Sequence, residues 1–153
     1  MTKRIFRPSK FPILAAALLA AFSLHAARRT PRTTPLQEWR QVSSANIPRE
    51  LQLLVGSETC FREVRAEIGD AALFGRMARL LKKHFDRYDR KTVVAALRRM
   101  ETLQRSVDPV RAATDLTHIR SRVELVADKD PETWRPVLEM LDATIKELTA
   151  NYR

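Results

Sequence analysis

Apolar residues recur every three or four positions from Asn46 to the end of the chain, a period typical of amphipathic helices. Side chains suited to a helix N-cap divide the first part of this stretch into four expected helices: Asn46, Ser57, Asp70 and Asp89. Gly56 and Gly69 are expected to end the first two of them. We expect the third helix over Ala71–Tyr88 and the fourth over Arg90–Ser106.

The last two expected helices carry the clearest signals. Asp108-Pro109 and Asp130-Pro131 each join a capping carboxylate to a proline whose fixed φ suits the first helical turn. After each pair, apolar residues are spaced alternately four and three apart, which averages the ~3.5 of a coiled coil. The sequence predicts that these two helices end the chain as an antiparallel coiled-coil-like hairpin. Pro136 is expected either to kink the last helix or to shift its start to about Thr133.

No stretch alternates apolar and polar residues between turn signals, so no β-strand is expected. The predicted fold class is all-α, a helical bundle of four to six helices over residues 46–153. A domain of this length can bury a core without a structural metal or disulfide. The single cysteine also excludes a disulfide scaffold and a cysteine-based zinc finger.

A hydrophobic segment precedes this domain. Residues 1–10 are cationic, residues 11–27 carry no charge, and Arg28 and Arg29 follow directly. This pattern predicts that residues 1–27 are a signal peptide or an N-terminal membrane anchor, although residues 11–27 are short for a span of the ~30 Å hydrocarbon core. Two alternatives remain open: an arginine-rich organelle presequence and a buried N-terminal helix.

Residues 28–45 are expected to form a linker, because prolines, threonines and serines interrupt any regular apolar pattern there. Within it, Leu36, Trp39 and Val42 recur every three residues. These side chains could form a short interfacial turn at a membrane or dock on the helical domain. Docking is the interpretation we favour.

The basic residues are unevenly placed along the chain. The formal net charge is +10, from 28 Lys and Arg against 18 Asp and Glu. Residues 1–37 contain seven basic residues and no acidic one, which leaves only a small excess for the helical domain. That excess lies in residues 76–99, with nine basic and two acidic residues, while the stretches on either side are slightly acidic.

One helix face in this basic stretch is a candidate binding surface. Steps of 100° along the third expected helix place five basic residues within an arc of about 80°, opposite its apolar face: Arg76, Arg79, Lys83, Arg87 and Arg90. Such a face could contact phosphates, anionic lipid headgroups or an acidic partner, or be merely solvated. No aromatic residue lies among these five, so nucleic acid is a possible partner but not the favoured one.

Candidate chemistry is sparse elsewhere. His84 falls on the apolar face of its helix, which favours a packed core histidine, and His118 has only Asp115 nearby as a second metal ligand. Cys60 lies at the edge of an apolar face and is expected to be buried and inert. With 3 Gly, none in a phosphate-binding loop, and no catalytic motif, we expect no catalytic residues, no metal, no cofactor and no enzymatic activity.

Taken together, these features favour a non-enzymatic helical interaction or scaffold module. It would be tethered to a membrane through residues 11–27, or exported across one, and would present helix faces to a protein partner or an anionic surface. The alternative is a nucleic-acid-contacting subunit of a larger assembly, imported into an organelle such as the mitochondrion.

Overall fold

The computed structural model describes residues 33–42 and 46–150, and this part of the chain is helical with no strand. The structure confirms the all-α prediction: six α-helices lie within residues 46–150, which is the upper limit expected for that range, and one more lies within residues 33–42. Their bounds are α2 Pro35–Arg40, α3 Ile47–Gly56, α4 Glu58–Ile68, α5 Asp70–His84, α6 Arg90–Leu103, α7 Pro109–Ala127 and α8 Pro131–Ala150. Short 3₁₀ turns over Phe85–Arg87 and Gln104–Ser106 follow α5 and α6.

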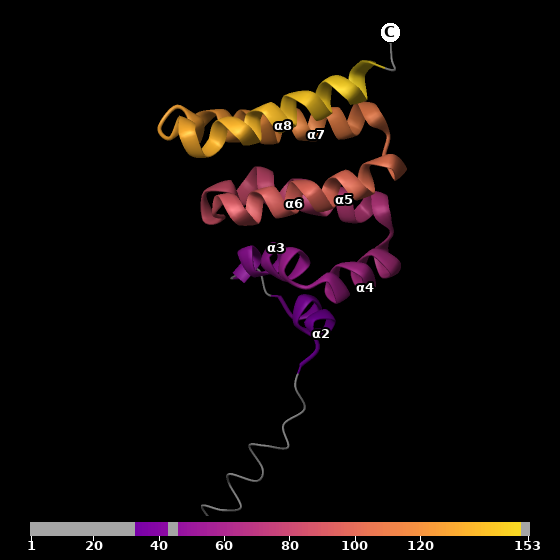
Figure 1. Ribbon diagram of the computed structural model, residues 1–153. Helices are drawn as coiled ribbons and strands as arrows, with labels where there is room; N and C mark the ends of the chain where they lie inside the picture. Colours follow the sequence, from indigo (N-terminus) through magenta and orange to yellow (C-terminus); the bar gives the residue numbers. More distant parts are fainter. Residues whose placement is uncertain (1–32, 43–45, 151–153) are drawn as a thin grey trace, which may run out of the picture. The chain divides into compact units, whose positions relative to one another are not determined.

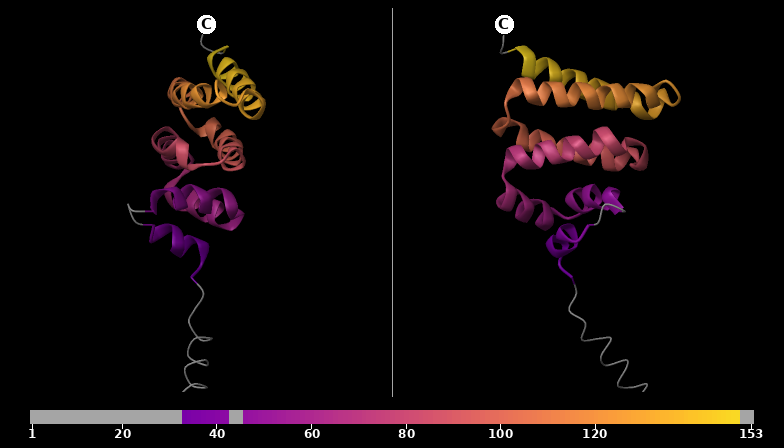
Figure 2. Two further views of the ribbon diagram at one scale, coloured as in Figure 1. Left: turned by 90° about the vertical axis from the view of Figure 1, so that its left-hand side faces the viewer. Right: turned by 180° about the vertical axis from the view of Figure 1, so that it is seen from behind.

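Consecutive helices pair, and the pairs are stacked on one another. Figure 1 shows α3 with α4, then α5 with α6, then α7 with α8, while α2 lies against the first pair. The two further views in Figure 2 keep the same order of layers. Helix α5 contacts α3, α4, α6 and α7, so it occupies the centre of the stack. A residue on α5 is therefore either in the core or on the surface of the middle layer.

The apolar periods predict the core correctly. The largest fully buried side chains come from six helices and the 3₁₀ turn after α5, and they include Phe74, Met77, Leu81, Phe85 and Ile119. The apolar residues that the helical period places on one face from Leu73 to Tyr88 are all buried: Leu73, Phe74, Met77, Leu80, Leu81, Phe85 and Tyr88. No helix in the described ranges 33–42 and 46–150 is both long and apolar enough to cross a bilayer. The predicted hydrophobic segment, residues 11–27, lies outside those ranges.

Four of the expected caps are present, among them the Asp130 carboxylate, which accepts a hydrogen bond from the backbone N–H of Thr133 at 3.3 Å. The side chains of Ser57, Asp89 and Asp108 accept hydrogen bonds from the backbone N–H of Cys60, Thr92 and Val110, at 3.1, 2.8 and 2.8 Å. Each bond satisfies a donor that the first helical turn leaves unpaired.

Two of the expected caps are wrong. The Asn46 side chain makes no capping hydrogen bond to α3. Asp70 is the first residue of α5, after Gly69 at φ 88°, and its carboxylate instead accepts hydrogen bonds from Arg65 at 2.7 and 2.8 Å. The Arg65 guanidinium donates two charge-assisted hydrogen bonds to the Asp70 carboxylate, which are stronger than a single bond from a backbone N–H. This difference explains why the Asp70 side chain points back to α4.

The helical packing begins before residue 46. Helix α2 forms inside the stretch expected to be a linker, with a reciprocal cap between Thr34 and Gln37. Its Trp39 is 8% exposed and belongs to the hydrophobic core. Trp39 therefore docks on the helical domain, as favoured from the sequence. The compact unit accordingly starts at Thr34.

Helices α5 and α6 end earlier than their apolar periods indicate. Helix α5 stops at His84, and the chain passes through the 3₁₀ turn Phe85–Arg87 to an extended Tyr88. Phe85 packs against Trp134 with ring centroids 5.5 Å apart, and Tyr88 is buried. Both side chains stay buried although the chain leaves the helix before them, so the turn keeps them in the core.

The last two helices lie side by side and are joined by the short turn at 128–130. Helix α8 begins at Pro131 and continues through Pro136. The expected shift of its start to about Thr133 is therefore wrong, because the Asp130 carboxylate accepts a hydrogen bond from the Thr133 N–H and caps the earlier turn.

Candidate interaction cleft

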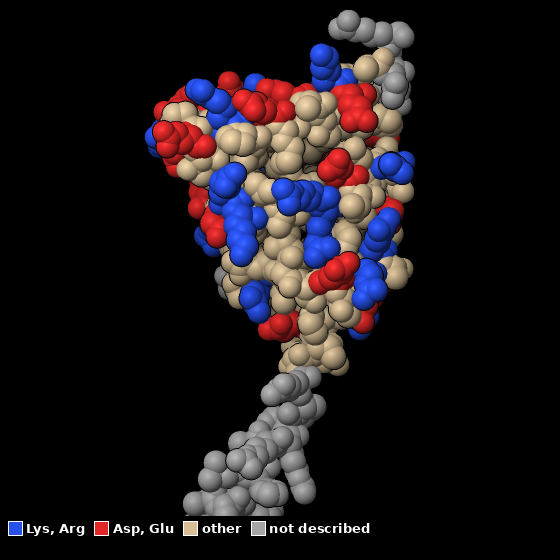
Figure 3. All heavy atoms as spheres, in the orientation of Figure 1, with Lys and Arg blue, Asp and Glu red and all other residues tan. Residues whose placement is uncertain are grey.

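The charge on the surface follows the layers of the stack. On the face shown in Figure 3, basic side chains spread over the middle of the molecule, and acidic ones gather along the layer of α7 and α8. This distribution reflects the sequence, in which the basic excess falls within residues 76–99. Residues 76–99 include most of α5 and α6. The middle layer therefore offers the strongest positive field of the described domain.

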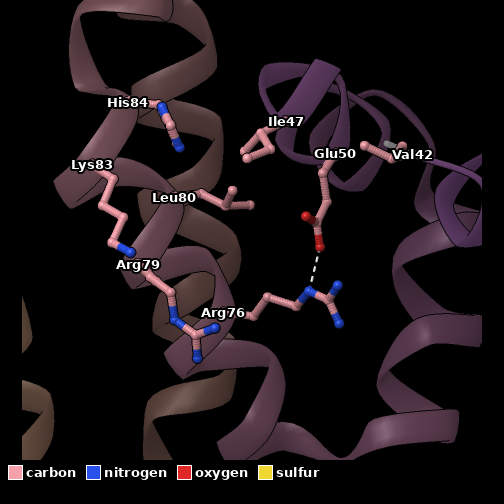
Figure 4. A pocket seen from close by; sticks show the side chains of 8 residues that line it. All are labelled: Val42, Ile47, Glu50, Arg76, Arg79, Leu80, Lys83 and His84. Atoms are coloured by element: carbon pink, nitrogen blue, oxygen red, sulfur yellow. Dashed lines mark ion pairs between the residues drawn. The ribbon is translucent and has the colours of Figure 1, made fainter. Parts of the chain in front are cut away.

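A cleft of about 480 Å³ opens between α3 and the basic side of α5. A volume of this size is typical of a binding site for a small ligand and is larger than a packing defect. Figure 4 shows the side chains that line it: Val42, Ile47, Glu50, Arg76, Arg79, Leu80, Lys83 and His84. Five of the eight come from α5, at spacings that keep them on one side of that helix.

The floor and walls of the cleft differ in chemistry. Leu80 of α5 and Ile47 of α3 point toward each other, and with Val42 they supply apolar surface. Arg79 and Lys83 stand on the α5 wall one helical turn apart. The cleft is thus an apolar depression edged by positive charge.

Arg76 is already engaged within the chain. Its guanidinium pairs through Nε with Oε1 of Glu50 and lies over the ring of Trp39, 4.8 Å from the ring centroid. The Glu50 residue is only 7% exposed, and a buried carboxylate is stable only when it is paired. Arg76 therefore stabilises the contact between α2, α3 and α5, and it adds little net charge to the cleft.

Arg79 and Lys83 are the two basic groups of the cleft that remain available. Both residues are exposed, and neither forms an ion pair or hydrogen bond with any residue that the structure describes. An unpaired pair of cations one turn apart beside apolar surface is suited to binding two negative groups at matching spacing.

The structure brings together only part of the predicted basic face. Arg76, Arg79 and Lys83 line the cleft, whereas Arg87 lies in the 3₁₀ turn and Arg90 begins α6. Arg87 and Arg90 are exposed and do not line it. The expectation of one continuous arc of five residues is wrong because α5 ends at His84, beyond which steps of 100° no longer apply.

His84 is not the core histidine that we expected. It is half-buried, lines the cleft, and its ring points into the space between Leu80 and Ile47 (Figure 4). Sequence periodicity also misses Glu50, whose partner is 26 positions away and which has no local signal beyond being a charged residue within an apolar helix.

Tyr88 extends the polar cluster behind the cleft. Its hydroxyl is buried and has no hydrogen-bond partner among the described residues, and the same holds for Nε1 of Trp39. Burial raises the pKa of Tyr88 to about 12, and the negative charge of Glu50 adds to this effect. Both groups are uncharged at neutral pH, so the wall behind Arg76 contains polar atoms but no further ion.

The remaining candidates from the sequence do not form a site. Asp115 pairs with Lys82 at 2.8 Å and is not a partner of the exposed His118. Cys60 is buried, and burial, followed by the charges of Glu63 and Glu38, raises the pKa of its thiol. Within residues 33–42 and 46–150, no three His, Cys, Asp or Glu side chains are grouped as metal ligands would be.

Comparison with protein-family models finds no matching family, and comparisons with curated proteins and with solved structures find no match to this chain.

Proposed function

We propose that this protein is a non-enzymatic helical interaction module that binds a protein partner on the middle layer of its helix stack. The cleft between α3 and α5 is the observation that carries the proposal. It combines exposed, unpaired Arg79 and Lys83 with apolar surface from Ile47 and Leu80. Such a mixture is typical of protein-binding sites, where an apolar centre supplies affinity and charges at the edge supply specificity.

The stacked architecture supports this role. Each helix pair buries one side against its neighbours and leaves its other faces open, so a rigid scaffold presents side chains from several helices together. We propose further that the final helix pair packs in the antiparallel coiled-coil-like manner expected from its spacing. That packing would fix the upper layer as a rigid support for α5.

The membrane part of the proposal rests on residues 1–27. An uncharged stretch between basic residues would tether the module to a bilayer, or direct its export across one. Cleavage after this segment would give the exported form, and retention would give the single-pass form.

Affinity purification of the full-length chain from its own cells tests the proposal. Membranes and culture medium are separated first, and bound proteins are then compared between the natural chain and an Arg79→Glu, Lys83→Glu double variant. We expect the chain in the membrane or exported fraction, with a bound protein that is lost from the double variant. Salt should weaken the binding, because exposed charges are screened.

The matched control is a Lys91→Glu, Arg98→Glu double variant, which makes the same change in net charge on exposed residues of α6 that do not line the cleft. It should retain the partner. An unprocessed chain found in the cytosol without any need for detergent would contradict the membrane assignment. Recovery of nucleic acid in place of protein would support the alternative of an imported nucleic-acid-contacting subunit.

A further inference from the structure

The cleft also indicates what kind of partner segment it binds. Resting on the proposed function, we infer that its occupant is an acidic amphipathic helix of the partner. This helix would place one apolar side chain between Ile47 and Leu80 and two carboxylates, one turn apart, on Arg79 and Lys83.

The spacing of the two cations argues for a helical partner. Arg79 and Lys83 are four residues apart on α5, so they lie about 6 Å from each other along the helix. Acidic residues three or four apart on a second helix have the same separation. A helix lying beside α5 can therefore satisfy both cations without distortion.

The walls of the cleft argue against an extended segment. All but one of the lining residues lie on α3 or α5, whose backbone groups are hydrogen-bonded within the helices. An extended peptide needs a strand edge to pair its own backbone groups, whereas a helix pairs them internally. A helical segment therefore loses no backbone hydrogen bond on entering this cleft.

The shape and composition of the cleft favour this partner over a lipid surface. The apolar floor lies between two helices, where a flat layer of headgroups does not reach. Its volume of about 480 Å³ accommodates a few side chains and not a folded domain. An apolar anchor flanked by carboxylates matches both halves of the site.

The test uses the full-length chain in a non-ionic detergent and a labelled peptide of about 18 residues, long enough to form a helix. The peptide contains leucine at one position of each turn and glutamates one turn apart beside it. A second peptide has the same composition in an order that separates the glutamates from the leucines. Vesicles of phosphatidylglycerol and a single-stranded RNA are the remaining probes.

We expect the patterned peptide to bind at low salt, and to bind at least about tenfold more tightly than the reordered one. The Arg79→Glu, Lys83→Glu variant should weaken binding by about tenfold or more. The Lys91→Glu, Arg98→Glu variant should change it less than about twofold. Circular dichroism of both variants checks that each one folds.

A second readout locates the peptide. The chain has three histidines, of which His84 lines the cleft and His118 is exposed on α7. With ¹⁵N-labelled histidine, the His84 resonance should move on binding and the His118 resonance should not. Val42→Thr, which exchanges a methyl group for a hydroxyl in the cleft, should weaken binding of the peptide, and circular dichroism checks that this variant folds.

Absence of peptide binding at about millimolar concentration and low salt would overturn the inference. Equal affinity for the two peptides would also overturn it, and so would an equal loss of peptide affinity in the two charge variants. A His84 shift caused by vesicles or RNA but not by peptide would also overturn it. These outcomes differ from failure of the proposed function, because a protein partner retained through another surface would still be isolated from cells.

Discussion

Glu50 is the residue on which the inner wall of the cleft depends. It is almost fully buried, yet its partner Arg76 has a side chain that is 45% exposed and reaches solvent beside Trp39. Glu67 forms the contrasting pair with Arg40, in which both side chains are about half exposed. The two carboxylates therefore differ in burial while making the same type of contact.

Replacing Glu50 with alanine should lower the free energy of unfolding by about 1–2 kcal/mol, because Arg76 then loses its partner and the Trp39 contact loosens. Glu67→Ala should change it by less than about 0.5 kcal/mol, as is usual for exposed pairs. Urea unfolding of both variants provides the comparison. Equal losses would show that burial of Glu50 contributes nothing.

Tyr88 should make the stability of the protein sensitive to alkaline pH. The pKa of its hydroxyl rises from 10.0 to about 12 because of burial, so the unfolded chain releases this proton first. Its contribution to stability is full below about pH 10 and is lost as the pH rises toward 12. Urea unfolding at about pH 9 and pH 11 should show a smaller decrease for Tyr88→Phe than for the natural chain.

At neutral pH the same Tyr88→Phe variant should unfold within about 1 kcal/mol of the natural chain, since the buried hydroxyl has no described partner to lose. A much larger loss of stability would mean that the hydroxyl is hydrogen-bonded in solution.

At the scale of the helix, Asp89 and Asn46 show that a residue suited to capping does not always form the cap. Asp89 caps α6, and hydrogen bonds from Thr92 lower the pKa of its carboxyl group. Asn46 occupies the same position before α3 without a side-chain cap. We expect Asp89→Ala to cost about 1 kcal/mol of unfolding free energy and Asn46→Ala less than about 0.5.

The loss of unfolding free energy caused by Asp89→Ala should also become smaller in acid. The ionised carboxylate stabilises the folded chain fully at a pH above its unfolded pKa, and this stabilisation is lost as the pH falls through the lowered pKa of the folded state. Thermal unfolding at neutral and acidic pH measures both effects. Equal costs for Asp89 and Asn46 would contradict the capping geometry.

The positions of the helices could be predicted from the sequence because their apolar periods and most of their caps are local features. The ends of α5 and α6 could not, since each helix gives way to a 3₁₀ turn where the apolar period alone would continue. Helix α2 was also missed. Leu36, Trp39 and Val42 do recur every three residues, but the prolines, threonines and serines around them favoured a linker over a helix.

For the molecule as a whole, the stack depends on α2, the first of the helices that the structure describes. Trp39 of α2 packs into the core formed by the later helices. A chain beginning at residue 46 should therefore be about 3 kcal/mol less stable than one beginning at residue 34, an amount typical of losing a buried tryptophan. Urea unfolding of the two chains measures the difference, and equal stability would show that α2 does not dock.

Only the α5 side of the candidate site could be predicted from the sequence. Helical spacing correctly grouped Arg76, Arg79 and Lys83 on the outer side of α5. The opposite wall could not be predicted, because Ile47 and Glu50 are about thirty positions away and meet α5 only through the stacking of the layers. Spacing also gave no sign that Arg76 is neutralised within the chain, which leaves Arg79 and Lys83 as the two cations of the cleft that pair with no described residue.

The most direct test of the cleft as the binding surface is photo-crosslinking in the full-length chain within its own cells. A photoreactive residue replaces Lys83 in the cleft or, as the control, the exposed Lys146 on α8. The account predicts a protein adduct from position 83 that is absent from position 146 and disappears when Arg79→Glu is added. An identical adduct from both positions, or none from position 83, would contradict it.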